Sequence, residues 1–188
     1  SDDSAPMDLL AEIFSSSFVP LSFGGSISSV NQAKKIISMG CEKIILGSHS
    51  YSNPSLSIEL ALEIGAQSVI LAIDVRKENE NYNVYANQGS IKLPFSLEEI
   101  LTSAKKNGIG EIHLTNIDLT GTFLGIDYEL AFFARKLTNL PLVIGGGLNK
   151  ENLSDENLDN RIDLSGSSIF CIRQPLDAPL LNYDSNDW

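Results

Sequence analysis

Six short apolar stretches rich in β-branched residues recur along the chain. Most of them have too few polar positions for a sheet with one face in water, so we interpret them as buried parallel strands. The stretches are Val19–Phe23, Lys43–Leu46, Val69–Ile73, Glu111–Ile117, Leu142–Ile144 and Ile162–Leu164.

Between these stretches, apolar residues return at the spacing of one helix face. The four apolar stripes begin at Val30, Leu56, Leu97 and Leu130. Ser96 with Glu99 has the pattern of a capping box, and Asp127 is predicted to cap the fourth helix. The longest connection, Val75–Phe95, is expected to contain a hairpin around Tyr82–Ile91. The repeated order of strand and helix predicts an α/β fold.

Two pairs of segments resemble each other in the same order and at nearly the same offset. Pro20–Ser26 is similar to Pro141–Gly147, and Ile45–Ser48 is similar to Leu164–Ser167. Such pairs predict a duplicated half. A barrel of eight βα units usually needs about 200 to 250 residues, and only nineteen residues precede Pro20. We therefore expect residues 1–188 to form a single partial domain, an incomplete (βα)8 TIM-type barrel with strands 3 to 8.

Charge and composition restrict the classes of partner. Thirteen basic against 24 acidic residues give a net charge of −11, which argues against nucleic acid or an anionic membrane as a main partner. No apolar run approaches the roughly 18 to 20 residues of a membrane span. The first residues lack the features of a signal peptide, and Cys41 and Cys171 lie too far apart to predict a disulfide framework. We expect a cytoplasmic protein with reduced thiols.

Glycines directly after a strand can aim backbone amides at an anion, and a following hydroxyl residue adds a donor. Phosphate sites after strands 7 and 8 are common in TIM barrels. Two such sites are predicted, which together imply a substrate phosphorylated at both ends. The residues of the first site are Gly146, Gly147, Ser167 and Ser168, and those of the second are Gly24, Gly25 and Ser48. The first is ranked higher because Ser26 has a Cβ where the other copy has glycine.

Aspartates at strand ends are the other chemical signal, because strand carboxyl ends face the active site of a barrel. Asp74 ends one strand and Asp118 follows another. A carboxyl walled by apolar strands can exchange protons near neutral pH, although such aspartates also cap loops. We interpret His49 and His113 as packed or solvated side chains. The sequence predicts no metal site, no cofactor and no covalent nucleophile.

With these residues in view, the stretch from about Pro20 to Phe170 resembles the cyclase subunit of imidazole glycerol phosphate synthase, a (βα)8 barrel. The segments that carry the resemblance are Val19–Ile27, Asn53-Pro54, Leu71–Asp74, Gly110–Asp118, Gly121-Thr122, Gly125–Asp127 and Gly145–Gly147. The family closes an imidazole ring on a bisphosphorylated histidine precursor, with ammonia from a glutaminase partner. The resemblance therefore implies a cyclase that works with a glutamine amidotransferase.

The resemblance also implies roles for single residues. Asp74 matches the second of two catalytic aspartates, and the first belongs to strand 1, which we expect to be absent. Lys43 and Glu111 match two of the four charged residues around the family's ammonia entrance. Asp118, Thr120 and Thr122 fall in the segment that reads Asp-Arg-Asp-Gly-Thr in the family, so they are further candidate active-site residues.

Several departures from the family keep other functions open. Thr120 replaces an active-site carboxylate, Gly145 replaces a serine and Gly47 replaces an asparagine. The segment from Ser167 to Tyr183 resembles relatives linked to sugar amidation in surface-polysaccharide synthesis more than it resembles members of the histidine pathway. The alternatives are a non-catalytic barrel that binds phosphate or a partner, and the sister isomerase of the histidine pathway. An open barrel edge also predicts association of two copies or poor solubility.

Overall fold

The computed structural model describes residues 7–153, 158–167, 169, 172–173 and 178–179. Within these ranges the main sheet contains six parallel strands in the order β1-β2-β3-β6-β7-β8. They are β1 (Ser22–Gly24), β2 (Lys43–Leu46), β3 (Val69–Glu78), β6 (Glu111–Asn116), β7 (Leu142–Gly145) and β8 (Ile162–Ser165). Their spatial order follows the chain, as in a barrel.

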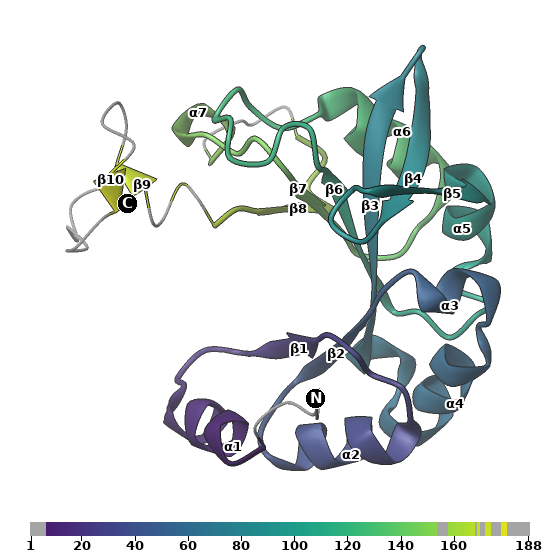
Figure 1. The fold of residues 1–188 in the computed structure, drawn as a ribbon, viewed down its shortest axis with the longest axis vertical. Helices are drawn as coiled ribbons and strands as arrows, with labels where there is room; N and C mark the ends of the chain where they lie inside the picture. The colour runs from purple at the N-terminus through teal and green to yellow at the C-terminus, as the bar shows by residue number, and fades with distance from the viewer. Residues whose placement is uncertain (1–6, 154–157, 168, 170–171, 174–177, 180–188) are drawn as a thin grey trace.

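The helices lie on the convex side of this sheet, which follows an open arc in Figure 1. Three predicted helix starts are capped by a side-chain oxygen: Ser29 accepts from the amide of Gln32, Ser96 from that of Glu99, and Asp127 from that of Leu130. The helices are α1 (Met7–Ser16), α2 (Val30–Ser38), α3 (His49–Ser52), α4 (Ser55–Ile64), α5 (Leu97–Ser103), α6 (Tyr128–Leu137) and α7 (Lys150–Leu153), with a 3-10 turn, η1, at Ala66–Ser68.

The hydrophobic core lies between the sheet and these helices. Alternate strand residues such as Ile44, Ile73, Ile112 and Leu142 are fully buried on the convex side. Each of the four longer helices after β1 contributes at least one large side chain that is almost completely buried in the same layer, namely Ile36, Leu60, Leu101 and Leu130. The apolar stripes recognised in the sequence therefore form the core.

The strand residues that alternate with these buried ones lie on the concave face of the sheet. Strands β1 and β8 end the sheet, and no further strand pairs with either of them within the described ranges. This is the α/β architecture of an incomplete TIM barrel, as predicted. A separate two-stranded piece, β9 (Ile172–Arg173) and β10 (Ala178–Pro179), follows. No helix in the described part of the chain is long and apolar enough to cross a membrane. Cys41 is buried and free, while Cys171 lies outside the described residues.

The first strand is shorter than the predicted Val19–Phe23. Pro20 has no amide to donate to a ladder, and the amide of Val19 bonds instead to the hydroxyl of Ser17 at 3.2 Å. Val19 is 66% exposed as a result. Pairing with β2 therefore begins only at Ser22.

The expected hairpin exists, but it is larger than predicted and includes β3. Strand β3 continues beyond Asp74 to Glu78 and pairs with β4 (Asn81–Ala86), which pairs in turn with β5 (Ile91–Ser96). Asp74 therefore does not end its strand, contrary to the sequence-based expectation. It lies where parallel pairing with β6 and antiparallel pairing with β4 meet.

The two segments that match in sequence have similar loop conformations, but their strands pair with the neighbouring strands in different registers. Gly25 and Gly146 have φ values of 116° and 96°, and Ser26 and Gly147 have 51° and 81°. In the strands, however, Gly24 pairs with Ile45 whereas Gly145 pairs with Ser165. The second sequence match aligns Ile45 with Leu164, so it is displaced by one residue and places equivalent side chains on opposite faces.

Candidate functional site

A pocket of about 380 Å³ lies at the carboxyl ends of β6, β7 and β8. Its floor is formed by the glycine loop after β7, with hydroxyl groups from the neighbouring strands and loops. The residues that line it are Thr115, Thr120, Gly121, Phe123, Gly145, Gly146, Gly147, Leu148, Ser165, Gly166, Ser167 and Ile169. Gly146, Gly147 and Ser167, three of the four residues predicted for the first phosphate site, are thus together. The fourth, Ser168, lies outside the described residues.

The glycine loop is packed so closely that a side chain has no room. Gly146 has a φ of 96°, and a Cβ on it would come within 2.2 Å of the carbonyl oxygen of Asn116. Gly147 has a φ of 81°, and a Cβ there would come equally close to the carbonyl oxygen of Gly125. Glycine is therefore required here both by backbone conformation and by space.

The loop between β6 and α6 forms one wall of the pocket and is tied to the glycine loop. The amide of Gly125 donates to the carbonyl of Gly147 at 2.8 Å. The amides of Ile126 and Asn149, one from each loop, both donate to the side-chain oxygen of Asn152. The two loops therefore form one unit.

The other residues of this wall have different environments. Thr120 lines the pocket, where a hydroxyl replaces the carboxylate that the family resemblance led us to expect. The hydroxyl of Thr122 donates to the carbonyl of Leu119 at 2.7 Å, so it is engaged within the loop. Asp118 is half exposed and pairs with Arg76, 3.1 Å from Asp118 Oδ1 to Arg76 Nε. Its carboxylate therefore already has a cationic partner.

Asp74 lies in the same cross-strand row as the pocket floor. Asp74 pairs with Thr115, Thr115 pairs with Gly145, and Gly145 pairs with Ser165. Two strand spacings of about 4.8 Å put the Cα atoms of Asp74 and Gly145 roughly 10 Å apart. Burial raises the pKa of Asp74 above its ordinary value, because a charged carboxylate loses hydration there. An acid of this kind can hold or release a proton close to a bound ligand.

The second predicted phosphate loop has a different environment. Gly24, Gly25 and Ser26 are exposed at the edge of the sheet. Ser48 directly precedes the short helix α3. The structure therefore does not place this loop in the pocket that Gly146 and Gly147 line.

At the opposite, amino-terminal end of the strands, Lys43 and Glu111 form an ion pair across β3. Lys43 Nζ lies 2.5 Å from Glu111 Oε2, and His113 Nε2 lies 2.7 Å from the other carboxylate oxygen. Burial works to raise the pKa of Glu111, but the hydrogen bonds from Lys43 and His113 outweigh it and hold this pKa below its ordinary value. His113 therefore has a specific partner, which its position in a strand alone did not indicate.

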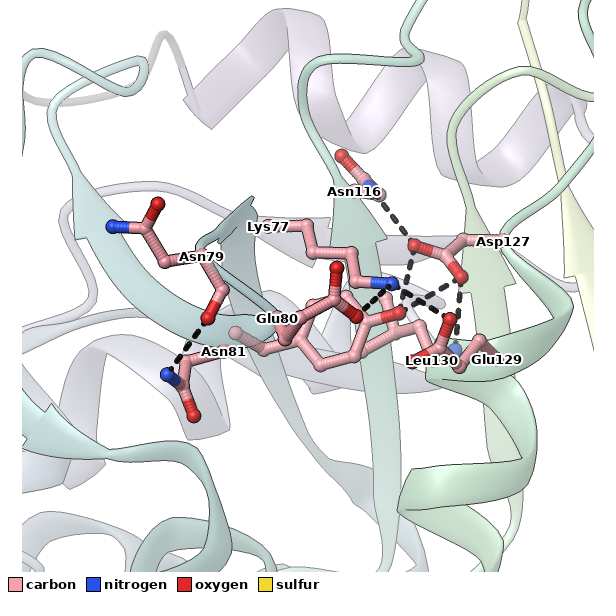
Figure 2. Close-up of polar contacts among 9 residues, drawn as sticks. Lys77, Asn79, Glu80, Asn81, Asn116, Asp127, Glu129 and Leu130 are labelled. Carbon is pink, nitrogen blue, oxygen red and sulfur yellow. Dashed lines mark hydrogen bonds and ion pairs between the residues drawn. The ribbon is translucent and has the colours of Figure 1, made fainter.

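A polar cluster that the sequence did not reveal fixes the hairpin to α6. The Tyr82 hydroxyl donates to both carboxylate oxygens of Asp127 at 3.0 and 3.1 Å, and Asn116 Nδ2 donates to the same carboxylate at 2.8 Å. Figure 2 shows this carboxylate beside the ion pair between Lys77 and Glu129, whose atoms are 2.7 Å apart. Burial and the bond to Asp127 raise the pKa of Tyr82. Asp127 is thus a junction between hairpin, strand and helix, as well as the predicted helix cap.

Residues 2–160 match the family model described as "Histidine biosynthesis protein". Three curated relatives are each described as imidazole glycerol phosphate synthase subunit HisF. The protein from Dictyoglomus thermophilum is 34% identical over 75% of this chain and 56% of its own length. That from Chlorobium limicola is 33% identical over 84% and 63%, and that from a Thermotoga strain is 30% identical over 89% and 67%. The chain thus spans little more than half the length of the first of these relatives.

Proposed function

The chain belongs to the histidine biosynthesis protein family, and from this we propose that it forms the phosphate-binding and proton-transfer part of a HisF-type cyclase. The proposed reaction is ring closure on a bisphosphorylated imidazole precursor, or a related amidation of a sugar, with ammonia supplied by a glutaminase partner. A cytoplasmic location is part of the same proposal.

The observation that carries this proposal is the row that joins Asp74 to the glycine loop. A phosphate held by the amides and hydroxyls of Gly146, Gly147 and Ser167 would leave the rest of its ligand pointing along the row toward Asp74. General acid or base catalysis requires a titratable group within hydrogen-bond reach of the reacting atoms. The raised pKa of Asp74 suits that role.

The ammonia supply is the second part of the proposal. Lys43 and Glu111 lie at the first positions of β2 and β6, on the end of the sheet away from the pocket. In this proposal they form part of the entrance through which a partner delivers ammonia to the concave face. The half-buried pair gives this end of the sheet a specific charged feature.

A non-catalytic binding role is favoured by one observation, the hydroxyl of Thr120 at a pocket position where the family resemblance leads us to expect a carboxylate. The row of Asp74, Thr115, Gly145 and Ser165 contains a single carboxylate. Acid or base assistance contributes roughly 10² to 10⁴-fold per group. We therefore expect the 188-residue chain alone to show no detectable cyclase turnover with ammonium salts, and ordinary enzymatic turnover would contradict this.

Titration with inorganic phosphate, followed by backbone amide NMR shifts, tests the binding site directly. We expect the amides of Gly146 and Gly147 to respond at lower phosphate concentration than those of Gly25 and Ser48. Gly146→Ala should lose this response, because its Cβ would meet the carbonyl of Asn116. Gly25→Ala is the matched control, because Gly25 has a similarly positive φ, and the same backbone strain on substitution, but nothing within 4 Å of its Cβ position. An equal response at both loops, or none, would refute the assigned site.

A further inference from the structure

Phe123, in the loop between β6 and α6, has a backbone conformation that bulky residues rarely adopt. Its φ of 57° lies in the left-handed region, which is unfavourable for a residue with a large side chain on Cβ. Such strain persists only where the surrounding structure imposes it, and it is concentrated at ligand sites.

The neighbours of Phe123 impose this conformation. The amide of Leu124 donates to the hydroxyl of Thr122, which spans Phe123 on both sides. The side-chain amide of Asn149 donates to the carbonyl of Phe123, and the amide of Gly125 is bonded to Gly147. The loop is therefore fixed before and after the residue, and Phe123 is one of the residues that line the pocket.

The pocket is larger than a phosphate group requires. Five heavy atoms at the packing of liquid water, about 30 Å³ each, would fill roughly 150 Å³, whereas the pocket measures about 380 Å³. Three of the lining residues are apolar: Phe123 on one loop, Leu148 after the glycine loop, and Ile169 after β8. The pocket lining thus combines glycine and hydroxyl residues with apolar ones.

We propose that Phe123 is a specificity-determining residue whose ring packs against the ring of a cyclic sugar phosphate held by the glycine loop. This inference rests on the proposed function and adds to it a residue of this chain that would contact the sugar part of the ligand. The bonds around Phe123 hold its backbone in place before binding, so the ligand does not have to order this residue. Apolar and aromatic walls with a few fixed polar groups are typical of small-molecule sites.

The test compares three phosphates by isothermal titration and amide NMR: inorganic phosphate, glycerol phosphate and ribose 5-phosphate. The variants are Phe123→Leu, which keeps apolar bulk but removes the ring, and Phe123→Gly, which also relieves the positive φ. Leu124→Ala is the matched control, because Leu124 is the adjacent residue and is 77% exposed.

The wild-type chain should bind ribose 5-phosphate more tightly than inorganic phosphate. Phe123→Gly should reduce the affinity for ribose 5-phosphate roughly two- to tenfold, the range of an aromatic packing contact, while the affinity for inorganic phosphate stays the same. The affinity of Phe123→Leu for ribose 5-phosphate should lie between those of the wild type and Phe123→Gly, and Leu124→Ala should change neither affinity. Because glycine tolerates the backbone conformation, Phe123→Gly should unfold at a urea concentration no lower than the wild type does, which separates this role from a structural one.

The outcomes distinguish the two levels of the proposal. If phosphate binds at Gly146 and Gly147 but the preference for ribose 5-phosphate survives in both Phe123 variants, the role of Phe123 is overturned and the phosphate site stands. An equal affinity of the wild type for all three phosphates has the same meaning. If no phosphate binds, the proposed function and this inference both fail.

Discussion

Replacing Asp127 by alanine removes the junction between the hairpin, strand β6 and helix α6. The change eliminates the N-cap of α6, which usually contributes about 1 kcal/mol. It also leaves the side-chain amide of Asn116, a residue only 5% exposed, without the acceptor now 2.8 Å away. A buried donor left unsatisfied costs about 1 to 3 kcal/mol. We therefore expect the free energy of unfolding to fall by about 3 kcal/mol.

Urea denaturation followed by circular dichroism measures this loss. Ser96→Ala is the matched control, because Ser96 caps α5 through a single bond to the Glu99 amide at 3.4 Å, so its removal should cost about 1 kcal/mol or less. With a urea dependence of about 2 kcal/mol per molar, the midpoints should move down by roughly 1.5 M and 0.5 M respectively. Asp127→Asn keeps a good cap residue but directs an NH₂ group toward donors, so it should fall between the two.

The reasoning fails if Asp127→Ala and Ser96→Ala lower the free energy of unfolding by the same amount within about 0.5 kcal/mol. That result would mean that the bonds from Tyr82 and Asn116 are replaced by water without loss, and that the hairpin is held by its strand pairing alone. A changed slope of the urea curve for Asp127→Ala would instead indicate that the hairpin separates before the rest of the sheet unfolds.

Two pH-dependent predictions have opposite signs. The pKa of Glu111 is lowered in the folded chain, so its contribution to the free energy of unfolding is complete above its ordinary pKa of 4.5 and is lost as pH falls through the folded value. Glu111→Gln should therefore destabilise the chain at pH 7 and much less at pH 3, as measured by urea midpoints. An equal loss at both pH values would contradict the assigned cause. The pKa of Asp74 is raised by burial, so its charge costs stability increasingly as pH rises above 3.8. Asp74→Asn should therefore stabilise the chain at pH 7 and have little effect near pH 3, whereas a loss of stability at pH 7 would show that the carboxylate has favourable partners.

The strands and helices with regular apolar patterns could be predicted from the sequence, because burial on one face determines their periodicity. The error at β1 is also explained by the sequence in retrospect: Pro20 cannot donate to a ladder, although the residues around it have β-forming side chains. The extension of β3 beyond Asp74 was not predictable from an apolar run, since Arg76 and Glu78 are polar and the pairing with β4 depends on the hairpin.

The conformation of the glycine loop in the candidate site was predictable, because glycine at these positions has a single conformational reason. Gly146 and Gly147 follow a strand, and their positive φ values agree with the turn that the sequence suggested. By contrast, Tyr82 and Asp127 are 45 residues apart, and no local pattern brings them together. The left-handed backbone of Phe123 could not be predicted either, because it depends on a bond from Asn149 in another loop and on the bond between the neighbouring Gly125 and Gly147.

The double pairing of Asp74 has a consequence for motion in the native state. Its strand is hydrogen-bonded to β6 on one side and to β4 on the other, so the segment around Asp74 cannot become exposed through fraying of a single strand. Solvent exchange at its backbone requires detachment of the hairpin or opening of the whole sheet, which places this residue among the slowest-opening parts of the chain. The backbone of Asp74 is therefore expected to keep its place in the sheet while less protected segments of the chain open and close.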